Sequence, residues 1–295
     1  MNDALAIDKR QVRRAFERAA HTYDAAAILQ HEVCARMLER LDYIKVAPRA
    51  ILDAGSGTGN ALKDLMVRYS GKPVIALDIA LAMLKHGHTR LRWWHSVPGL
   101  RPPLHALCAD LERLPLGGGT VGLIWSNLAL QWVNDLPATF KDMHRVLEAG
   151  GLLMFSTFGP DTLHELRSAY DGADASTHVN RFIDMHDIGD MLVHAGYADP
   201  VMDMERITLT YNDVRSLMHD LKAIGAHNVT QGRPHALSGK SILHQVEQRY
   251  EKLRRDGKLP ATFEVIYGHA WKPMPRLSPS GRPVIEIKAF TTPDS

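Results

Sequence analysis

Short apolar runs recur through the first half of the chain, separated by longer segments that mix apolar and polar residues. The runs carry few charges and are rich in Val, Ile, Leu and Ala. Runs of this kind are typical of strands that are buried on both faces in a parallel sheet. The predicted strands are residues 50–53, 74–78, 105–109, 122–126 and 152–157.

The segments between these strands have the spacing of amphipathic helices. In residues 61–69 the large apolar side chains fall three or four positions apart, which places them on one helical face. Residues 80–86 and 138–147 are the other predicted helices. Strands and helices that alternate in this way predict a doubly wound α/β fold. Because ligands of such folds bind beyond the carboxyl ends of the strands, the loops after the strands are the candidate site.

Amphipathic segments also flank the predicted sheet. Near the N-terminus, Val12, Phe16, Ala19 and Tyr23 recur every three or four residues, which predicts a helix with an apolar stripe. After the sheet, the pattern predicts helices at residues 161–170, 213–224 and 241–255, and strands at residues 206–211 and 262–271. We expect these strands to extend the sheet and the helices to form a cap.

Size, charge and cysteine content exclude several classes of protein. The chain has 295 residues, a formal net charge of +2 and two cysteines, Cys34 and Cys108. This length is enough for one large domain with a substantial core. The small net charge argues against binding of nucleic acid by charge alone, and two cysteines exclude a disulfide scaffold.

Neither a membrane segment nor a metal site is expected. No apolar run reaches the roughly 18 residues that a spanning helix needs, and the N-terminus lacks the apolar core of a signal peptide. The 16 histidines form none of the common metal-binding motifs. We therefore expect a cytoplasmic protein. Residues 90–103, rich in Pro and Gly, are expected to form a loop insertion.

A glycine-rich loop follows the first predicted strand directly. Residues 53–59 read D-A-G-S-G-T-G, and glycines at these positions allow a ligand to approach the backbone closely. The spacing differs from the G-x-G-x-x-G of dinucleotide-binding folds, and the Gly-Lys-Ser/Thr of a phosphate-binding loop does not follow. An acidic residue in front of the loop disfavours a pyrophosphate. It favours a ligand that carries a positive charge.

Acidic residues stand at or just after the ends of three successive predicted strands, at Asp53, Asp78 and Asp110. An acid at the second of these positions typically binds ribose hydroxyls. Together with the glycine loop, the three carboxylates indicate an adenosine-bearing cation, and S-adenosylmethionine is the common one. The alternative is that each Asp caps the helix that follows it.

The pattern at residues 45–160 resembles the class I S-adenosylmethionine-dependent methyltransferases. The resemblance implies a Rossmann-like, mostly parallel seven-stranded sheet, with a helical N-terminal lid and a helical cap insertion. It also implies roles in binding the cofactor. The glycine loop and Asp53 would contact its methionine and ribose parts, and Asp78 would bind the ribose hydroxyls. The adenine would lie against Ile79, Met83, Asp110 and Leu111, and Asn127 and Leu128 would close the pocket. The residues implied are Asp53, Gly55, Ser56, Gly57, Gly59, Asp78, Ile79, Met83, Asp110, Leu111, Asn127 and Leu128.

A longer resemblance, over nearly the whole chain, is to the malonyl-acyl-carrier-protein O-methyltransferases of biotin synthesis. It is carried by residues 16–23 (FERAAHTY), 126–132 (SNLALQW), 180–182 (NRF), 221–226 (LKAIGA) and 262–268 (TFEVIYG). It implies methylation of the free carboxyl of a malonyl group on an acyl carrier protein or on coenzyme A, with S-adenosylhomocysteine as the second product.

Part of the same pattern is shared with a mitochondrial complex I assembly factor, which is also similar at residues 161–167 (DTLHELR) and 259–262 (LPAT). The alternative function is therefore hydroxylation or chaperoning of a respiratory subunit. Methylation of another small carboxylate is a further alternative. On the resemblance, the chain divides into a lid (1–45), a cofactor-binding core (46–160), cap helices with the last strands (161–271) and a surface tail (272–295).

Three residues are candidates for holding the substrate carboxylate: Tyr23, Arg181 and Lys222. The methyl transfer needs no general base, because a carboxyl group is already ionised at neutral pH. One or two hydrogen-bond donors that orient it are enough. Phe16, Gln131 and Trp132 are expected to line the substrate entrance. The competing interpretation makes Tyr23 and Trp132 packing residues and leaves Arg181 and Lys222 in solvent.

The N-terminal helix also carries a cluster of positive charge. Acyl carrier proteins are acidic, so a basic face on the same helix as the predicted lid suggests a docking surface for one. The residues are Lys9, Arg10, Arg13, Arg14 and Arg18. A solvated basic helix without a partner is the alternative.

Overall fold

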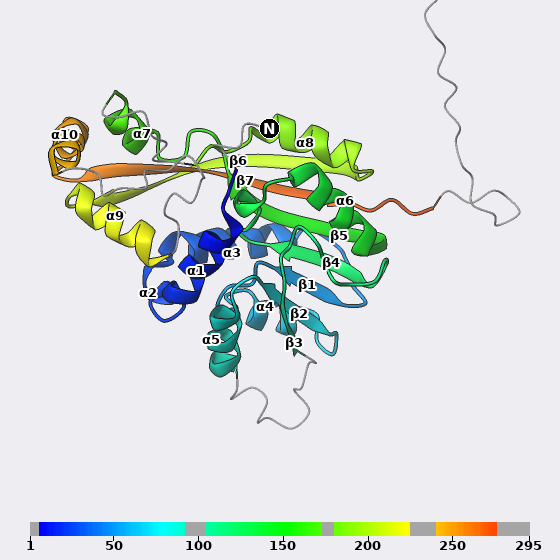
Figure 1. Ribbon diagram of the computed structural model, residues 1–295. Coiled ribbons are helices and arrows are strands. Elements are labelled where there is room, and N and C mark those ends of the chain that lie inside the picture. The colour runs from blue at the N-terminus through cyan, green and yellow to red at the C-terminus, as the bar shows by residue number, and fades with distance from the viewer. Residues whose placement is uncertain (1–5, 92–103, 173–179, 225–239, 276–295) are drawn as a thin grey trace, which may run out of the picture.

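A seven-stranded sheet forms the centre of the computed structural model, which describes residues 6–91, 104–172, 180–224 and 240–275. The strands are β1 (Ile51–Ala54), β2 (Val74–Asp78), β3 (Leu104–Cys108), β4 (Val121–Ser126), β5 (Leu147–Phe158), β6 (Ala198–Tyr211) and β7 (Leu259–Trp271). Their order in the sheet is β3-β2-β1-β4-β5-β7-β6 (Figure 1). All neighbouring pairs are parallel except the two pairs that involve β7. The doubly wound, mostly parallel seven-stranded sheet that was expected is confirmed.

Helices cover both faces of this sheet. They are α1 (Lys9–Ala19), α2 (Tyr23–Ala26), α3 (Ile28–Leu41), α4 (Leu62–Arg68), α5 (Leu81–Leu91), α6 (Leu136–Val146), α7 (His164–Tyr170), α8 (Met185–His194), α9 (Val214–Ala223) and α10 (Lys240–Glu251), with a 3-10 turn η3 at Leu130–Trp132. Apolar side chains of α3, α4, α9 and α10 share one core cluster, and those of α6 and α8 share the cluster on the opposite face. None of the described helices combines the length and the apolar composition needed to cross a membrane.

Every predicted core strand is present in the structure, although the central strand β5 begins at Leu147, five residues before the predicted start. Strand β6 begins at Ala198, eight residues before the predicted start. It is an edge strand whose side chains alternate between half-buried and exposed, so charged residues interrupt its apolar run. Helices α3 and α8 were not predicted. The loop insertion at 90–103 and the tail after residue 275 lie largely or wholly outside the described residues.

The N-terminal segment forms two helices separated by three residues, and not the single helix that was predicted. Instead of continuing to Tyr23, α1 ends at Ala19, and Tyr23 is the first residue of α2. Figure 1 shows these two helices, in blue, between α5 and α9. We call α1 and α2 the lid helices.

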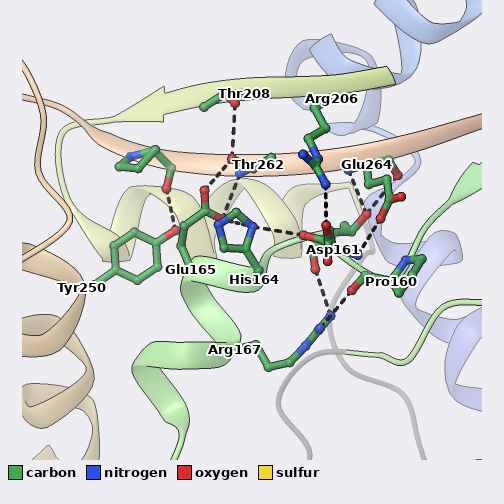
Figure 2. A network of polar contacts seen from close by, with 12 residues as sticks. Pro160, Asp161, His164, Glu165, Arg167, Arg206, Thr208, Tyr250, Thr262 and Glu264 are labelled. Atoms are coloured by element: carbon green, nitrogen blue, oxygen red, sulfur yellow. Dashed lines mark hydrogen bonds and ion pairs between the residues drawn. The ribbon is translucent and has the colours of Figure 1, made fainter. Parts of the chain in front are cut away.

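A buried polar network fastens the segment after β5 to the last two strands (Figure 2). The Glu165 carboxylate on α7 accepts hydrogen bonds from the backbone N–H and the hydroxyl of Thr262 on β7. The Glu264 carboxylate accepts one from the Asp161 N–H, and Arg206 of β6 pairs with the Asp161 carboxylate at 2.7 Å. The motif at residues 161–167 thus has a structural role here: it anchors α7 and the end of β5.

Candidate functional site

The glycine loop between β1 and α4 depends on glycine for two different reasons. Gly55, Gly57 and Gly59 all have positive φ angles, of 82°, 56° and 81°. A Cβ atom on Gly55 would lie 2.3 Å from the Cβ of Ala129, so a side chain there would displace the loop after β4. A Cβ on Gly57 would meet nothing within 4 Å, because it would extend into open space. The loop is tightly packed behind and open in front, as a ligand-binding loop must be.

A cleft of about 590 Å³, including its solvent-open part, lies beyond the carboxyl ends of β1, β2, β3 and β4. We call it the main cleft. Nine of the predicted cofactor residues line it: Gly55, Gly57, Asp78, Ile79, Met83, Asp110, Leu111, Asn127 and Leu128. Phe16, Tyr23 and Trp132 line it as well, and the Phe16 and Trp132 rings meet edge to face with centroids 5.5 Å apart.

A smaller, polar chamber adjoins the main cleft and shares Tyr23, Gly55, Gly57 and Asn127 with it. Several polar atoms in its walls are buried and have no hydrogen-bond partner among the described residues. They are Gln30 Oε1, His31 Nε2, Asp53 Oδ2, Ser56 Oγ and Trp125 Nε1. Buried polar groups in folded proteins nearly always have a partner. Acceptors and donors left open around one chamber therefore fit a zwitterionic ligand such as the amino-acid end of S-adenosylmethionine.

Asp53 and Asp78 are both buried at the floor of these cavities. Burial raises the pKa of Asp53 to about 7, and the nearby Asp78 carboxylate adds to the shift. The pKa of Asp78 is raised to about 6, also chiefly by burial, although its carboxylate accepts hydrogen bonds from the N–H groups of Gly57 and Ala80. Two carboxylates held in this way gain strongly from a ligand that brings positive charge and hydroxyl donors.

Asp110 lies two residues beyond the end of β3 and meets a residue of the lid. The Lys9 ammonium is 3.0 Å from the Asp110 carboxylate and 2.9 Å from that of Glu112. Lys9 is therefore half-buried in the wall of the main cleft, which corrects its predicted place on an exposed basic face. Arg10, Arg13, Arg14 and Arg18 are exposed as predicted.

Further side-chain contacts fasten the lid helices to the core around the main cleft. The Glu17 carboxylate of α1 accepts hydrogen bonds from the backbone N–H groups of Leu81 and Ala82, the first residues of α5. In α2, the Asp24 carboxylate accepts a hydrogen bond from the Thr58 hydroxyl in the glycine loop. The lid is thus fixed to the same elements that form the floor of the cleft.

Tyr23 lines both the main cleft and the polar chamber. Its pKa is raised well above its usual range, first by burial and then by the negative charges of Asp78 and Asp24. The hydroxyl therefore keeps its proton at any physiological pH. It is a hydrogen-bond donor, not a base.

Comparison with known proteins shows which family this site belongs to. A family model described as "Methyltransferase domain" matches residues 52–155. A protein of Gallionella capsiferriformans named malonyl-[acyl-carrier protein] O-methyltransferase is 58% identical over 286 residues, which cover 97% of this chain and 98% of the relative. The chain belongs to the malonyl-[acyl-carrier protein] O-methyltransferase family.

Other relatives carry the same name. The proteins of Methylovorus sp. and Nitrosospira multiformis are 56% and 57% identical, over 97% and 92% of this chain and the same shares of the relatives. These relatives of the methyltransferase give no support to the alternative of a complex I assembly factor. The chain is therefore a methyltransferase, which is the class of enzyme that the sequence predicted.

Solved structures agree with the fold. A putative methyltransferase of Bacillus halodurans has a TM-score of 0.57 at 17% identity, covering 82% of this chain and 99% of that one. A Haemonchus contortus N-methyltransferase, solved with S-adenosylhomocysteine, has a TM-score of 0.50 at 16% identity and covers 82% and 52% of the two chains. At these identities the likeness concerns the class I methyltransferase fold.

The remaining predicted residues of the methyltransferase lie outside the main cleft. Gly59 supports the turn into α4, where a Cβ atom would lie 2.7 Å from the side chain of Leu62. Gln131 and Arg181 line a neighbouring side cavity, bounded by η3, the end of β5 and residues 180–183. In the part of the chain that the structure describes, Lys222 is exposed on α9 and lines none of these three cavities.

Sequence reasoning missed the polar residues of the chamber that lie away from the glycine loop, namely Gln30, His31 and Trp125. Gln30 and His31 belong to α3, a helix that was not predicted, and Trp125 was assigned to the core of β4 on hydrophobicity alone. The available signal was the amphipathic pattern of residues 28–41, whose buried face would have placed the two polar residues at the start of a packed helix.

Proposed function

We infer that this enzyme transfers a methyl group from S-adenosylmethionine to the free carboxyl of a malonyl group carried by an acyl carrier protein. The observation that carries the proposal is a pair of buried carboxylates in a chain of this family: Asp53 lines the chamber with unpaired polar atoms, and Asp78 lines the adjoining main cleft. The products are the malonyl methyl ester and S-adenosylhomocysteine. Masking the carboxyl in this way primes the acyl chain for biotin synthesis.

Each predicted cofactor residue has a place in this proposal. Asp53, with Ser56 and the other polar atoms of the chamber, binds the amino-acid end of the cofactor, and Asp78 accepts hydrogen bonds from the ribose hydroxyls. The glycine loop approaches the sulfur and the ribose. Ile79, Met83, Asp110, Leu111, Asn127 and Leu128 surround the adenine and close the pocket.

When bound, the cofactor supplies a methyl group on a positively charged sulfur, which a carboxylate oxygen attacks as the carbon–sulfur bond breaks. The residues of the enzyme contribute alignment and exclusion of water, which together can supply about 7–11 kcal/mol. Tyr23 donates a hydrogen bond to the substrate carboxylate at the boundary of the main cleft and the chamber. Phe16 and Trp132 shield the reacting groups from water. Arg181 lines the neighbouring side cavity and is a further candidate partner of the carboxylate, whereas the exposed Lys222 has no place in this proposal.

The exposed arginines of α1 support docking of the acidic carrier protein at the mouth of the main cleft. They stand on a helix whose opposite side contacts the core through Val12 and Ala15. Residues 1–45 then act as a lid, residues 46–160 as the cofactor-binding core and residues 161–271 as the cap, with a surface tail after residue 272. The cytoplasmic localisation of the protein stays a prediction.

The test is incubation of the enzyme with radiolabelled S-adenosylmethionine and malonyl-acyl-carrier protein. We expect label on the carrier protein in a form that mild base releases, as a methyl ester does. An Asp78→Ala variant serves as the control, because it removes the ribose contact and so abolishes cofactor binding and transfer together. Absence of transfer at saturating cofactor would overturn the proposal.

A further inference from the structure

The side cavity next to the main cleft combines apolar walls with unpaired acceptors. It lies between η3, the end of β5 and the residues before α8. The rings of Phe158 and Phe182 meet edge to face at 5.6 Å and, with Leu136 and Ile188, give it an apolar wall. A cavity with this lining accommodates methylene groups, and its few polar atoms decide what else binds there.

Gln131 presents an unpaired acceptor to this cavity. Its Nε2 donates a hydrogen bond of 2.6 Å to the carbonyl of Leu128, which fixes the orientation of the amide. Its Oε1 is therefore left as an acceptor, and this atom is buried without a partner within the described ranges. Leu128 itself lines the main cleft and has an unusual positive φ of 47°, so Gln131 is bonded directly to the wall of the cofactor site.

Asn180 provides a second unpaired hydrogen-bond acceptor in this cavity. Its side chain is more than nine-tenths buried, with 8% exposed, and its Oδ1 has no partner in the described part of the chain. The contrast with Asn134, which lines the same cavity, is direct. Asn134 exchanges two hydrogen bonds with the backbone of Ile7, so both its amide oxygen and its amide nitrogen have a partner. A ligand that brings hydrogen-bond donors into this apolar cavity would satisfy both Gln131 and Asn180.

We propose that the side cavity binds the pantetheine arm of the substrate, with Gln131 Oε1 and Asn180 Oδ1 accepting hydrogen bonds from its amide N–H groups. This rests on the function proposed above, and it names the part of the carrier that the enzyme recognises. The arm contains methylene groups and two secondary amides before its branched, hydroxyl-bearing end, and the first amide follows the thioester sulfur by only two methylenes. An acyl chain or a free malonate would bury both acceptors unpaired, which costs binding energy.

The test compares two substrates that differ only in the donors. One is malonyl-pantetheine, and the other is its analogue with an ester oxygen in place of each amide N–H. We expect the wild-type enzyme to use the amide substrate with a kcat/KM at least about tenfold higher, the usual effect of leaving a buried acceptor unpaired. In Gln131→Met and Asn180→Leu enzymes the two substrates should become more nearly equal, because only the amide substrate loses a contact.

Asn134→Ala is the matched control, since it removes an amide from the same cavity that already has partners. We expect it to change kcat/KM for both substrates by the same factor. Cofactor binding measured by calorimetry confirms that each variant is folded, and Gln131→Met remains informative if Asn180→Leu is not. Equal use of the two substrates by the wild-type enzyme overturns this assignment while leaving the methyltransferase function intact. Failure to methylate malonyl-acyl-carrier protein overturns the function itself.

Discussion

Asp53 and Asp78 are carboxylates whose environment prepares them for a ligand. Burial is the main reason that the pKa of Asp53 is raised to about 7 and that of Asp78 to about 6. A buried carboxylate is costly when charged, and this cost falls when a cation or a hydroxyl donor approaches it. The burial that makes the two carboxylates weaken the fold without a ligand thus favours the proposed binding of the cofactor.

This coupling predicts that cofactor binding depends on pH. The cofactor ammonium favours the charged form of Asp53, so binding lowers the pKa of this group from about 7 and releases a proton when the pH is below that value. We expect affinity to fall as the pH drops from 7 to 6, and calorimetry in buffers of different ionisation enthalpy to detect the released proton.

An Asp53→Asn variant provides the control, since it should bind the cofactor about tenfold or more weakly and lose this share of the pH dependence. The stability of the cofactor-free protein depends on pH in the opposite direction from the cofactor affinity. A raised folded-state pKa means that stability declines as the pH rises from about 4 towards 7, because in this range the carboxyl loses its proton in the unfolded chain before it does so in the folded protein. An affinity that is constant between pH 6 and 7, without proton release, would contradict the assignment.

Tyr23 permits a second prediction at the level of one residue. Its raised pKa keeps the hydroxyl protonated, so the proposed contribution is a hydrogen bond donated to the substrate carboxylate. Tyr23→Phe removes that donor and keeps the ring that packs near Phe16. We expect methyl transfer to fall about tenfold or more, with the cofactor dissociation constant unchanged in calorimetry. Parallel losses in both quantities would instead indicate a packing role.

At the level of elements, polar side chains of the lid helices add to the apolar contacts that Val12, Ala15 and Ala19 make with the core. Glu17 receives two N–H groups at the N-terminus of α5, where the helix also presents partial positive charge. Lys9 joins α1 to the loop after β3, and Asp24 joins α2 to the glycine loop. Contacts of this kind break at lower cost than an apolar interface of equal size, which suits a segment that must admit the cofactor.

Removal of the Glu17 contact should therefore speed cofactor release. In a Glu17→Ala enzyme we expect the dissociation rate of S-adenosylmethionine, followed by stopped-flow displacement, to rise about three- to tenfold, because Glu17 is partly exposed and its bonds are partly screened. Arg14→Ala, an exposed change on the same helix, is the control and should leave this rate as it is. A dissociation rate that is the same in both variants would show that Glu17 does not hold the lid.

At the level of the whole molecule, charge is distributed unevenly although the total is small. The formal net charge is +2, yet Arg10, Arg13, Arg14 and Arg18 all project from the exposed side of α1. Charges at the rim of an interface act mainly on the rate of association, and salt screens them. A carrier protein with an acidic surface would be guided to the side of the molecule on which the main cleft is closed by the lid.

Charge reversal of Arg13 and Arg14 to Glu should therefore lower kcat/KM for malonyl-acyl-carrier protein by about tenfold or more at low ionic strength, and by less at high ionic strength. Turnover of malonyl-pantetheine and binding of the cofactor should be unaffected. Reversal of Lys252 and Arg255, exposed residues just after α10, is the matched control. Equal losses for the carrier-bound and the small substrate would refute docking at this helix.

The sequence by itself determined the parallel core of the sheet and the class of ligand. The strands β1, β2, β4 and most of β5 are buried, and the apolar runs that burial requires are visible without a structure. The glycine loop and the acids Asp53 and Asp78 are equally local signals, because each is tied to a strand end that the pattern locates. The full extent of β6 escaped prediction, since an edge strand needs no continuous apolar run.

Only the tertiary structure decided which polar residues meet around the reacting groups. Lys9 carries the same charge as its neighbours on α1, yet its pairing with Asp110, about a hundred residues away, moves it from the surface into the wall of the cleft. Gln131 and Asn180 have nothing in their local sequence that marks unpaired oxygens, because a missing partner becomes visible only when everything packed around an atom is known. Local sequence encodes burial and backbone conformation, whereas complementarity between distant side chains arises from the packing of whole elements.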